Sequence, residues 1–108
     1  MTNEEIIESI KAQYNRDLRK QLVKNVLEHE KNQDREALKG GYAILNQIFS
    51  YVLGNLGWTL ADNAEDWDES PLEIMVMSFP KIETTRWFQQ LQLNVKRRIE
   101  LKIAEDAK

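Results

Sequence analysis

Apolar residues dominate residues 38–60, and no charged side chain occurs between Lys39 and Asp62. Within this stretch they recur at alternating spacings of four and three, which places them along one helical face: Leu38, Tyr42, Leu45, Phe49, Val52 and Leu56. Ile44, Ile48 and Leu53 widen the stripe. A helix that is apolar over so much of its circumference must be covered on several sides. The pattern predicts that this helix is the buried centre and that the other segments pack around it.

The first third of the chain also has a helical pattern. Thr2 and Glu5 have the spacing of a capping box, so a helix should begin there. Apolar residues then recur every four positions, at Ile6, Ile10, Tyr14, Leu18, Leu22 and Val26. Each step of four advances about 40° around a helix, so the stripe winds by about 200°. We expect one long helix; the alternative is a break near residues 15–17, where Asn15 or Asp17 could cap a new start.

Turn and glycine signals bound the central helix. Asp34 is a suitable N-cap, and Gly57 is a natural C-terminal stop. Gly40 and Gly41 lie early in the helix, where each should cost about 1 kcal/mol relative to alanine. Their missing side chains would let a neighbouring helix approach closely, and a bend or break is the alternative interpretation.

A short helix is predicted next. Ser70, Pro71 and Glu73 form a second helix-start signature, with proline at the first helical position. This helix should run through Met77 or Phe79, because Pro80 would end or kink it. Met75 and Met77 are interpreted as core fillers, and a flexible methionine binding surface is the less favoured interpretation.

The last segment, from Glu83 or Thr84 onward, has a helical stripe formed by Phe88, Leu91, Val95, Ile99 and Ile103. Residues 91–95 and 99–103 also alternate, so a hairpin turning at residues 96–98 is the minority model. That turn lacks Gly, Asn and Asp, which a tight hairpin normally needs. On a helix, Leu93 and Leu101 fall away from the main stripe, so they need either a second neighbour within the bundle or another copy of the chain. The latter motivates a homodimer hypothesis.

These patterns predict a mostly α fold, a compact small bundle of three long helices and one short helix. Residues 1–108 form a single helical domain in this prediction; the minority model is α+β with a C-terminal β-hairpin. A chain of 108 residues with 42% hydrophobic and 31% charged residues is ordinary for a soluble globular protein. The sequence contains no cysteine, so disulfides and thiolate ligands are excluded. We expect a cytoplasmic protein, since the acidic N-terminus does not resemble a signal peptide.

Two further observations bear on the environment of the chain. The uncharged run at residues 40–61 is long enough to cross a membrane, but polar residues and four glycines interrupt it, so a buried soluble helix is favoured. Charge is polarised along the sequence. Residues 40–79 carry six acidic and no basic residues, giving −6, and residues 80–108 carry seven basic and four acidic residues, giving +3. Such polarity guides association with charged partners.

The motifs in the chain argue against catalysis. His29 is the only histidine, so a zinc-protease helix is excluded. Gly40 and Gly41 lack the spacing of a phosphate-binding loop, and no serine lies in a nucleophile elbow. Asp66, Asp68 and Ser70 have the spacing of the first ligands in a calcium loop, but Pro71 and Met77 occupy positions that require glycine and glutamate. We therefore predict no metal and no cofactor, and a solvated acidic loop is favoured over an irregular, weak cation site. The enzyme alternative would be an unrecognised carboxylate site at Asp66 and Asp68.

The acidic segment around Trp67 is the favoured binding site. It consists of Asp62, Glu65, Asp66, Trp67, Asp68 and Glu69. An exposed tryptophan among carboxylates can anchor a contact with a basic protein surface, which predicts a regulator, an inhibitor, an adaptor or an assembly subunit. The alternative role for Trp67 is a ring folded back over the end of the bundle.

A rival prediction uses the basic residues of the last segment. Lys96, Arg97, Arg98 and Lys102 could contact phosphates of a nucleic acid. They are spread around a helix, the total charge is −3 and no nucleic-acid motif accompanies them, so solvated helix charges are favoured.

Overall fold

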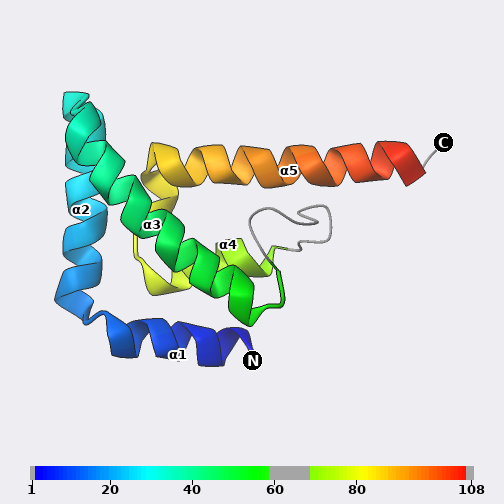
Figure 1. The fold of residues 1–108 in the computed structure, drawn as a ribbon, viewed down its shortest axis with the longest axis horizontal. Helices are drawn as coiled ribbons and strands as arrows, with labels where there is room; N and C mark the ends of the chain where they lie inside the picture. Colours follow the sequence, from blue (N-terminus) through cyan, green and yellow to red (C-terminus); the bar gives the residue numbers. More distant parts are fainter. Residues whose placement is uncertain (1, 59–68, 107–108) are drawn as a thin grey trace.

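The computed structural model describes the backbone of residues 2–58 and 69–106 and the side chains of residues 2–58 and 69–96. The elements are α1 (Asn3–Gln13), α2 (Arg16–Asn32), α3 (Arg35–Asn55), α4 (Ser70–Ser78), the 3₁₀ helix η2 (Ile82–Thr84) and α5 (Arg86–Asp106) (Figure 1). The predicted mostly α fold is confirmed, and the described ranges contain no strand. The minority hairpin is wrong, because residues 86–106 form one helix.

The prediction of one long first helix is wrong, and the alternative break is found. Tyr14 has an extended backbone, and Asn15 caps α2 by accepting a hydrogen bond from the Leu18 amide at 2.8 Å. The break lets α1 and α2 run in different directions (Figure 1). Arg19 holds the corner, because its guanidinium donates to the carbonyl oxygens of Tyr14 at 3.0 Å and Ser78 at 2.7 Å.

Other local predictions are confirmed. Thr2 and Glu5 form the capping box of α1, and the Asp34 side chain caps α3. Gly57 follows the end of α3 with φ of 86°, a conformation that favours glycine. The final helix begins later than predicted, at Arg86, because Thr85 accepts a hydrogen bond from the Phe88 amide at 3.1 Å.

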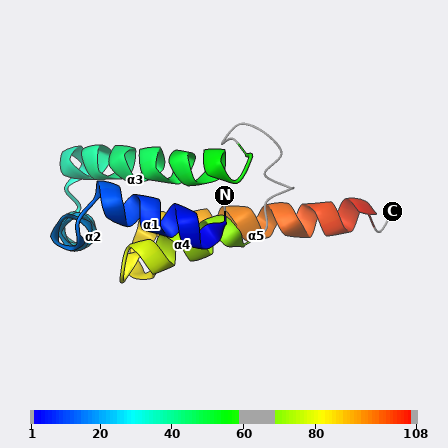
Figure 2. The same ribbon diagram turned by 90° about the horizontal axis from the view of Figure 1, so that it is seen from below.

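The core lies between α3 and the other elements. Figure 2 shows α3 on one side of the molecule, with α1, α4 and α5 on the other. α3 contributes the buried residues Leu45, Ile48, Phe49, Val52 and Leu53. One face of α3 remains open to solvent, because Ile44 and Tyr51 are exposed. Within the described residues, no helix is both long and apolar enough to cross a membrane.

Gly41 allows α2 and α3 to pack closely. A Cβ atom at Gly41 would lie 3.1 Å from Cγ2 of Val26 in α2, which is closer than an ordinary van der Waals contact. A Cβ atom at Gly40 would have nothing within 4 Å. The close-approach prediction is therefore confirmed for Gly41 and wrong for Gly40.

A buried carboxylate on α2 fixes the start of α5. Glu30 is 4% exposed, and its two carboxylate oxygens accept hydrogen bonds from the Arg86 amide at 3.0 and 2.9 Å. The Trp87 amide donates to the same carboxylate at 3.3 Å, and the Tyr42 hydroxyl donates to it at 2.5 Å. The first amides of a helix have no acceptor within the helix and lie at the positive end of its dipole, so a carboxylate is their natural partner.

Trp87 attaches the same turn of α5 to α3. Its indole Nε1 donates to Oδ1 of Asn46 at 2.9 Å, and its ring meets Phe49 edge-on at 6.1 Å between centroids. Beyond this attachment, the second half of α5 extends past the other helices (Figure 1). The radius of gyration is accordingly 14.6 Å, compared with about 13 Å for a compact domain of about 100 residues.

The two adjacent glycines provide a matched test of helix packing. Gly40→Ala should raise the free energy of unfolding by up to about 1 kcal/mol, because alanine favours the helix and its methyl group meets no neighbour. Gly41→Ala should be less stable than Gly40→Ala, because its methyl group meets Val26. Urea denaturation of both variants measures the difference. Equal stabilisation would contradict the close contact between α2 and α3.

Replacing Glu30 tests the attachment of α5. Glu30→Gln should lower the free energy of unfolding by about 1–3 kcal/mol, because its amide nitrogen cannot accept hydrogen bonds from the donors that face it. Glu28→Gln is the control, since Glu28 lies exposed on the same helix. Urea denaturation of both variants should show a loss for Glu30→Gln alone. A loss of the same size in both would contradict the attachment.

Tyr42 makes this attachment sensitive to alkaline pH. Burial, the hydrogen bond to Glu30 and the charge of that carboxylate together raise the pKa of Tyr42 from 10.0 to about 12. The folded state therefore favours the protonated phenol, and the resulting stability is fully present below pH 10 and is lost as the pH rises toward 12. The stability advantage of the wild type over Tyr42→Phe should shrink over this pH range. An advantage that stays constant in urea denaturation above pH 10 would contradict the shift.

Candidate functional site

α4 is apolar on two faces, and only one of them is buried. Its inner face consists of Pro71, Ile74, Met75 and Ser78, all of which are buried. The outer face consists of Leu72, Val76 and Met77, with Val76 37% exposed and Met77 65% exposed. A surface helix normally has polar residues on its outer face. The outer face of α4 is therefore a candidate contact surface.

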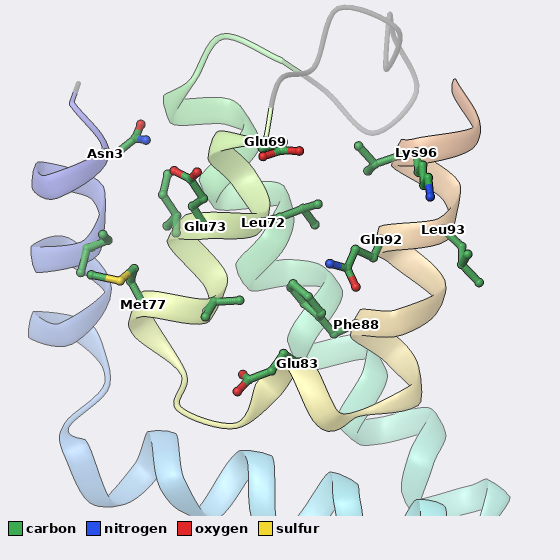
Figure 3. Close-up of a pocket in the computed structure, with 14 residues that line it drawn as sticks. Asn3, Glu69, Leu72, Glu73, Met77, Glu83, Phe88, Gln92, Leu93 and Lys96 are labelled. Atoms are coloured by element: carbon green, nitrogen blue, oxygen red, sulfur yellow. The ribbon is translucent and has the colours of Figure 1, made fainter. Parts of the chain in front are cut away.

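This outer face forms the floor of a groove of about 970 Å³. We call this depression the α4 groove. α1 forms one wall through Asn3 and Ile7, and α5 forms the other wall through Phe88, Gln92, Leu93, Val95 and Lys96. Figure 3 shows α4 between these two helices, with Leu72 and Phe88 on the side toward α5 and Met77 on the side toward α1. Leu93 is 60% exposed, so the α5 wall also presents apolar surface to solvent.

The charged residues of the α4 groove are mostly acidic. Among the described side chains, three acidic residues line the groove: Glu69 at the N-cap of α4, Glu73 on α4 and Glu83 on η2. Lys96 is the one basic residue of this described lining. All four are exposed, and none forms an ion pair with another residue of the described part. The groove thus combines an apolar floor with three carboxylates, which favours an apolar ligand carrying positive charge.

The described lining of the groove has few polar groups besides its charged residues. Apart from the carboxylates and Lys96, the polar lining side chains are the amides of Asn3 and Gln92. Residues 2–58 and 69–96 contain no cluster of three or more His, Cys, Asp or Glu residues that could hold a metal ion. An open groove lined in this way can desolvate an apolar helix, and its polar groups can orient that helix.

The attachment of α5 positions one wall of the groove. Glu30 and Trp87 fix the first turn of α5, and Phe88 follows directly as a buried residue of the core. The wall residues at positions 92, 93 and 96 continue from this fixed turn. On the opposite side, Arg19 ties the end of α1 to the end of α4 through its two hydrogen bonds.

The structure places only part of the predicted sites. Asp62, Glu65, Asp66, Trp67 and Asp68 lie outside the described residues. Glu69 is described and lies at one edge of the α4 groove, and Lys96, from the rival basic site, lies across the groove from it (Figure 3). Arg97, Arg98 and Lys102 belong to the helical backbone of α5, and their side chains lie outside the described part. One residue of each predicted site, Glu69 and Lys96, therefore lines the α4 groove.

The prediction for the two methionines is half correct. Met75 is fully buried, as expected of a core residue. The prediction that Met77 is a core residue is wrong. α4 turns one face toward the core, and Met77 lies on its exposed face. The departure of Leu93 from the main apolar stripe gave the correct signal, since this residue is exposed. Placing residues 70–78 around a helix in the same way would have shown that α4 has a second apolar stripe, away from its buried face.

Comparison of the chain with protein-family models, with curated proteins and with solved structures gives no match in any of the three.

Proposed function

We propose that this protein is a non-catalytic interaction module that holds a basic, amphipathic helix of a partner protein in the α4 groove. An inhibitor, an adaptor and an assembly subunit would all act in this way. The observation that carries the proposal is the outer face of α4, where Val76 and Met77 are exposed within a groove that three carboxylates line.

Burial of the exposed apolar side chains supplies the driving force. Full burial of one large apolar side chain contributes about 1.5–3 kcal/mol relative to its exposed state. Val76, Met77 and Leu93 are all partly exposed, so a ligand that covers them gains a fraction of this amount at each position. Helices typically bind such grooves with anchors at i, i+3, i+4 and i+7. The floor of the groove, which is itself helical, and its two helical walls suit this mode of packing.

Acidic residues orient the partner helix and raise its association rate. Glu69, Glu73 and Glu83 line the groove, and residues 62–68, with four further carboxylates, precede Glu69 directly in the chain. Such charges attract a basic partner and raise its association rate, more strongly at low salt. The proposal retains Trp67 as a second anchor, because it lies two residues before Glu69 in this acidic segment.

A pair of designed peptides tests the groove directly. Both peptides have the same leucine pattern of an amphipathic helix, and their polar positions are all lysine in one and all glutamate in the other. We expect the lysine peptide to bind and to shift the NMR amide signals of residues 72–77 and 92–96. Met77→Lys should weaken this binding at least about tenfold, because it adds positive charge to an apolar floor. Leu18→Lys adds the same charge at an exposed position on α2, outside the groove, and should not weaken it.

Equal binding of the two peptides would contradict the role of the carboxylates. Equal binding to the wild type and Met77→Lys would contradict the groove. A capture experiment from the native cells, repeated with Met77→Lys, Leu18→Lys and Trp67→Ala as baits, then identifies the partner. Recovery of nucleic acid alone, released by salt and insensitive to these variants, would instead support the rival function of the basic residues at positions 96, 97, 98 and 102.

A further inference from the structure

The second half of α5 has the chemistry that the α4 groove requires. Residues 96–102 contain Lys96, Arg97, Arg98 and Lys102 against one acidic residue, Glu100. Ile99, Leu101 and Ile103 lie between and beside these charges. The backbone of this half is helical, and it extends past the other helices (Figure 1). The chain therefore contains both an acidic, apolar groove and a basic helical segment with apolar residues.

The segment cannot fill the groove of its own chain. Among the side chains that the structure describes, the α5 wall of the groove extends to Lys96, and the helix continues without interruption to Asp106. Residues 86–106 contain neither glycine nor proline, so the sequence provides no break at which the second half could fold back over the first. An occupant with this sequence must come from another molecule.

We propose that the second half of α5 from a second copy of the chain occupies the α4 groove, and that the two copies exchange these segments reciprocally. The proposal rests on the function proposed above, because it assigns an occupant to the same groove. Glu69, Glu73 and Glu83 line the groove, and residues 96–102 carry four basic residues and one acidic residue, so the groove and the inserted segment have complementary charge.

A two-fold axis near residue 96 would fill the groove of each copy at the same time. α5 has 21 residues, and residue 96 is its midpoint. Antiparallel pairing of two α5 helices about this point places residues 97–106 of one copy beside residues 86–95 of the other. The contact is then isologous, and each copy gives and receives the same segment. Each half of α5 is about 15 Å long.

The register of this pairing brings apolar residues level with each other and, at the ends of α5, brings opposite charges together. Leu93, which is 60% exposed, lies level with Ile99 of the second copy. The basic residues at 97, 98 and 102 lie level with positions 95, 94 and 90 of the other copy, of which Val95 lines the groove that also contains Glu69, Glu73 and Glu83. The acidic end of α5, at Glu105 and Asp106, comes level with Trp87 and Arg86. Helices paired in this way bury the surface that a single copy leaves exposed.

Self-association then competes with partner binding. A second copy and a basic helix of another protein use the same apolar floor and the same carboxylates. A dimer with filled grooves must separate, at least in part, before a partner binds. The lysine peptide should therefore convert the dimer to a monomer, and the glutamate peptide should not.

Sedimentation velocity of the full chain over about a hundredfold range of concentration tests the exchange. We expect a dimer whose dissociation constant rises at least about tenfold in Met77→Lys, in the groove, and in Arg98→Glu, in the inserted segment. Leu18→Lys should leave the dimer unchanged. Combining Glu73→Lys with Arg98→Glu should restore part of the affinity that either charge reversal removes, because each copy again brings opposite charges together.

Three outcomes separate this inference from the proposed function. A wild type that stays monomeric yet binds the lysine peptide overturns the exchange and leaves the function standing. A dimer that Met77→Lys and Arg98→Glu do not weaken also overturns the exchange, because its interface lies elsewhere. A monomer that binds neither peptide contradicts both proposals. Circular dichroism of each variant shows whether the helices remain folded, and a variant that has unfolded is replaced by Leu93→Lys, at the exposed wall of the groove.

Discussion

The arrangement of the helices depends on one buried carboxylate. Glu30 lies on α2, and the backbone amides that it accepts from belong to Arg86 and Trp87, 56 and 57 residues later in the chain. These amides begin α5 and have no acceptor within the helix, so their buried partner, together with the Thr85 cap, fixes where α5 starts and in which direction it leaves the core. Tyr42 supplies a further donor from α3, and the three helices meet at one side chain. The position of the α5 wall, and with it the α4 groove, follows from this contact.

α4 introduces the opposite kind of constraint. It has apolar residues around most of its circumference, a pattern typical of a helix that is buried on most sides. The described part of the fold covers only the face that includes Ile74 and Met75. Exposed apolar residues such as Met77 and Val76 lower stability and solubility, and for this reason we propose that a ligand covers them. The function and the exchange proposed here both follow from this one uncovered face, and they differ in which molecule covers it.

Local signals predicted local structure well. The capping box at Thr2, the N-cap at Asp34 and the helix stop before Pro80 each depend on residues within a few positions, so the sequence alone was sufficient. The role of Glu30 could not be predicted in this way. Residues 28–31 are mostly charged, so a glutamate among them is expected to be solvated unless its distant partners, the amides of Arg86 and Trp87, are known. Met77 was missed for a related reason. A methionine in an apolar segment is expected in the core. Only the burial of the other face of α4 shows that Met77 points outward. The candidate site was therefore predicted only in part, at Glu69, Leu93 and Lys96, and its apolar floor was not.

Amide hydrogen exchange at Arg86 and Trp87 tests the central claim most directly. These two amides begin a helix, so in an ordinary helix they would exchange rapidly with solvent. The hydrogen bonds to Glu30 predict that both are protected in the wild type and that Glu30→Gln lowers their protection, together with that of the groove wall at residues 88–95. Rapid exchange of both amides in the wild type, or protection that Glu30→Gln leaves unchanged, would contradict the claim that Glu30 fixes α5 and shapes the groove.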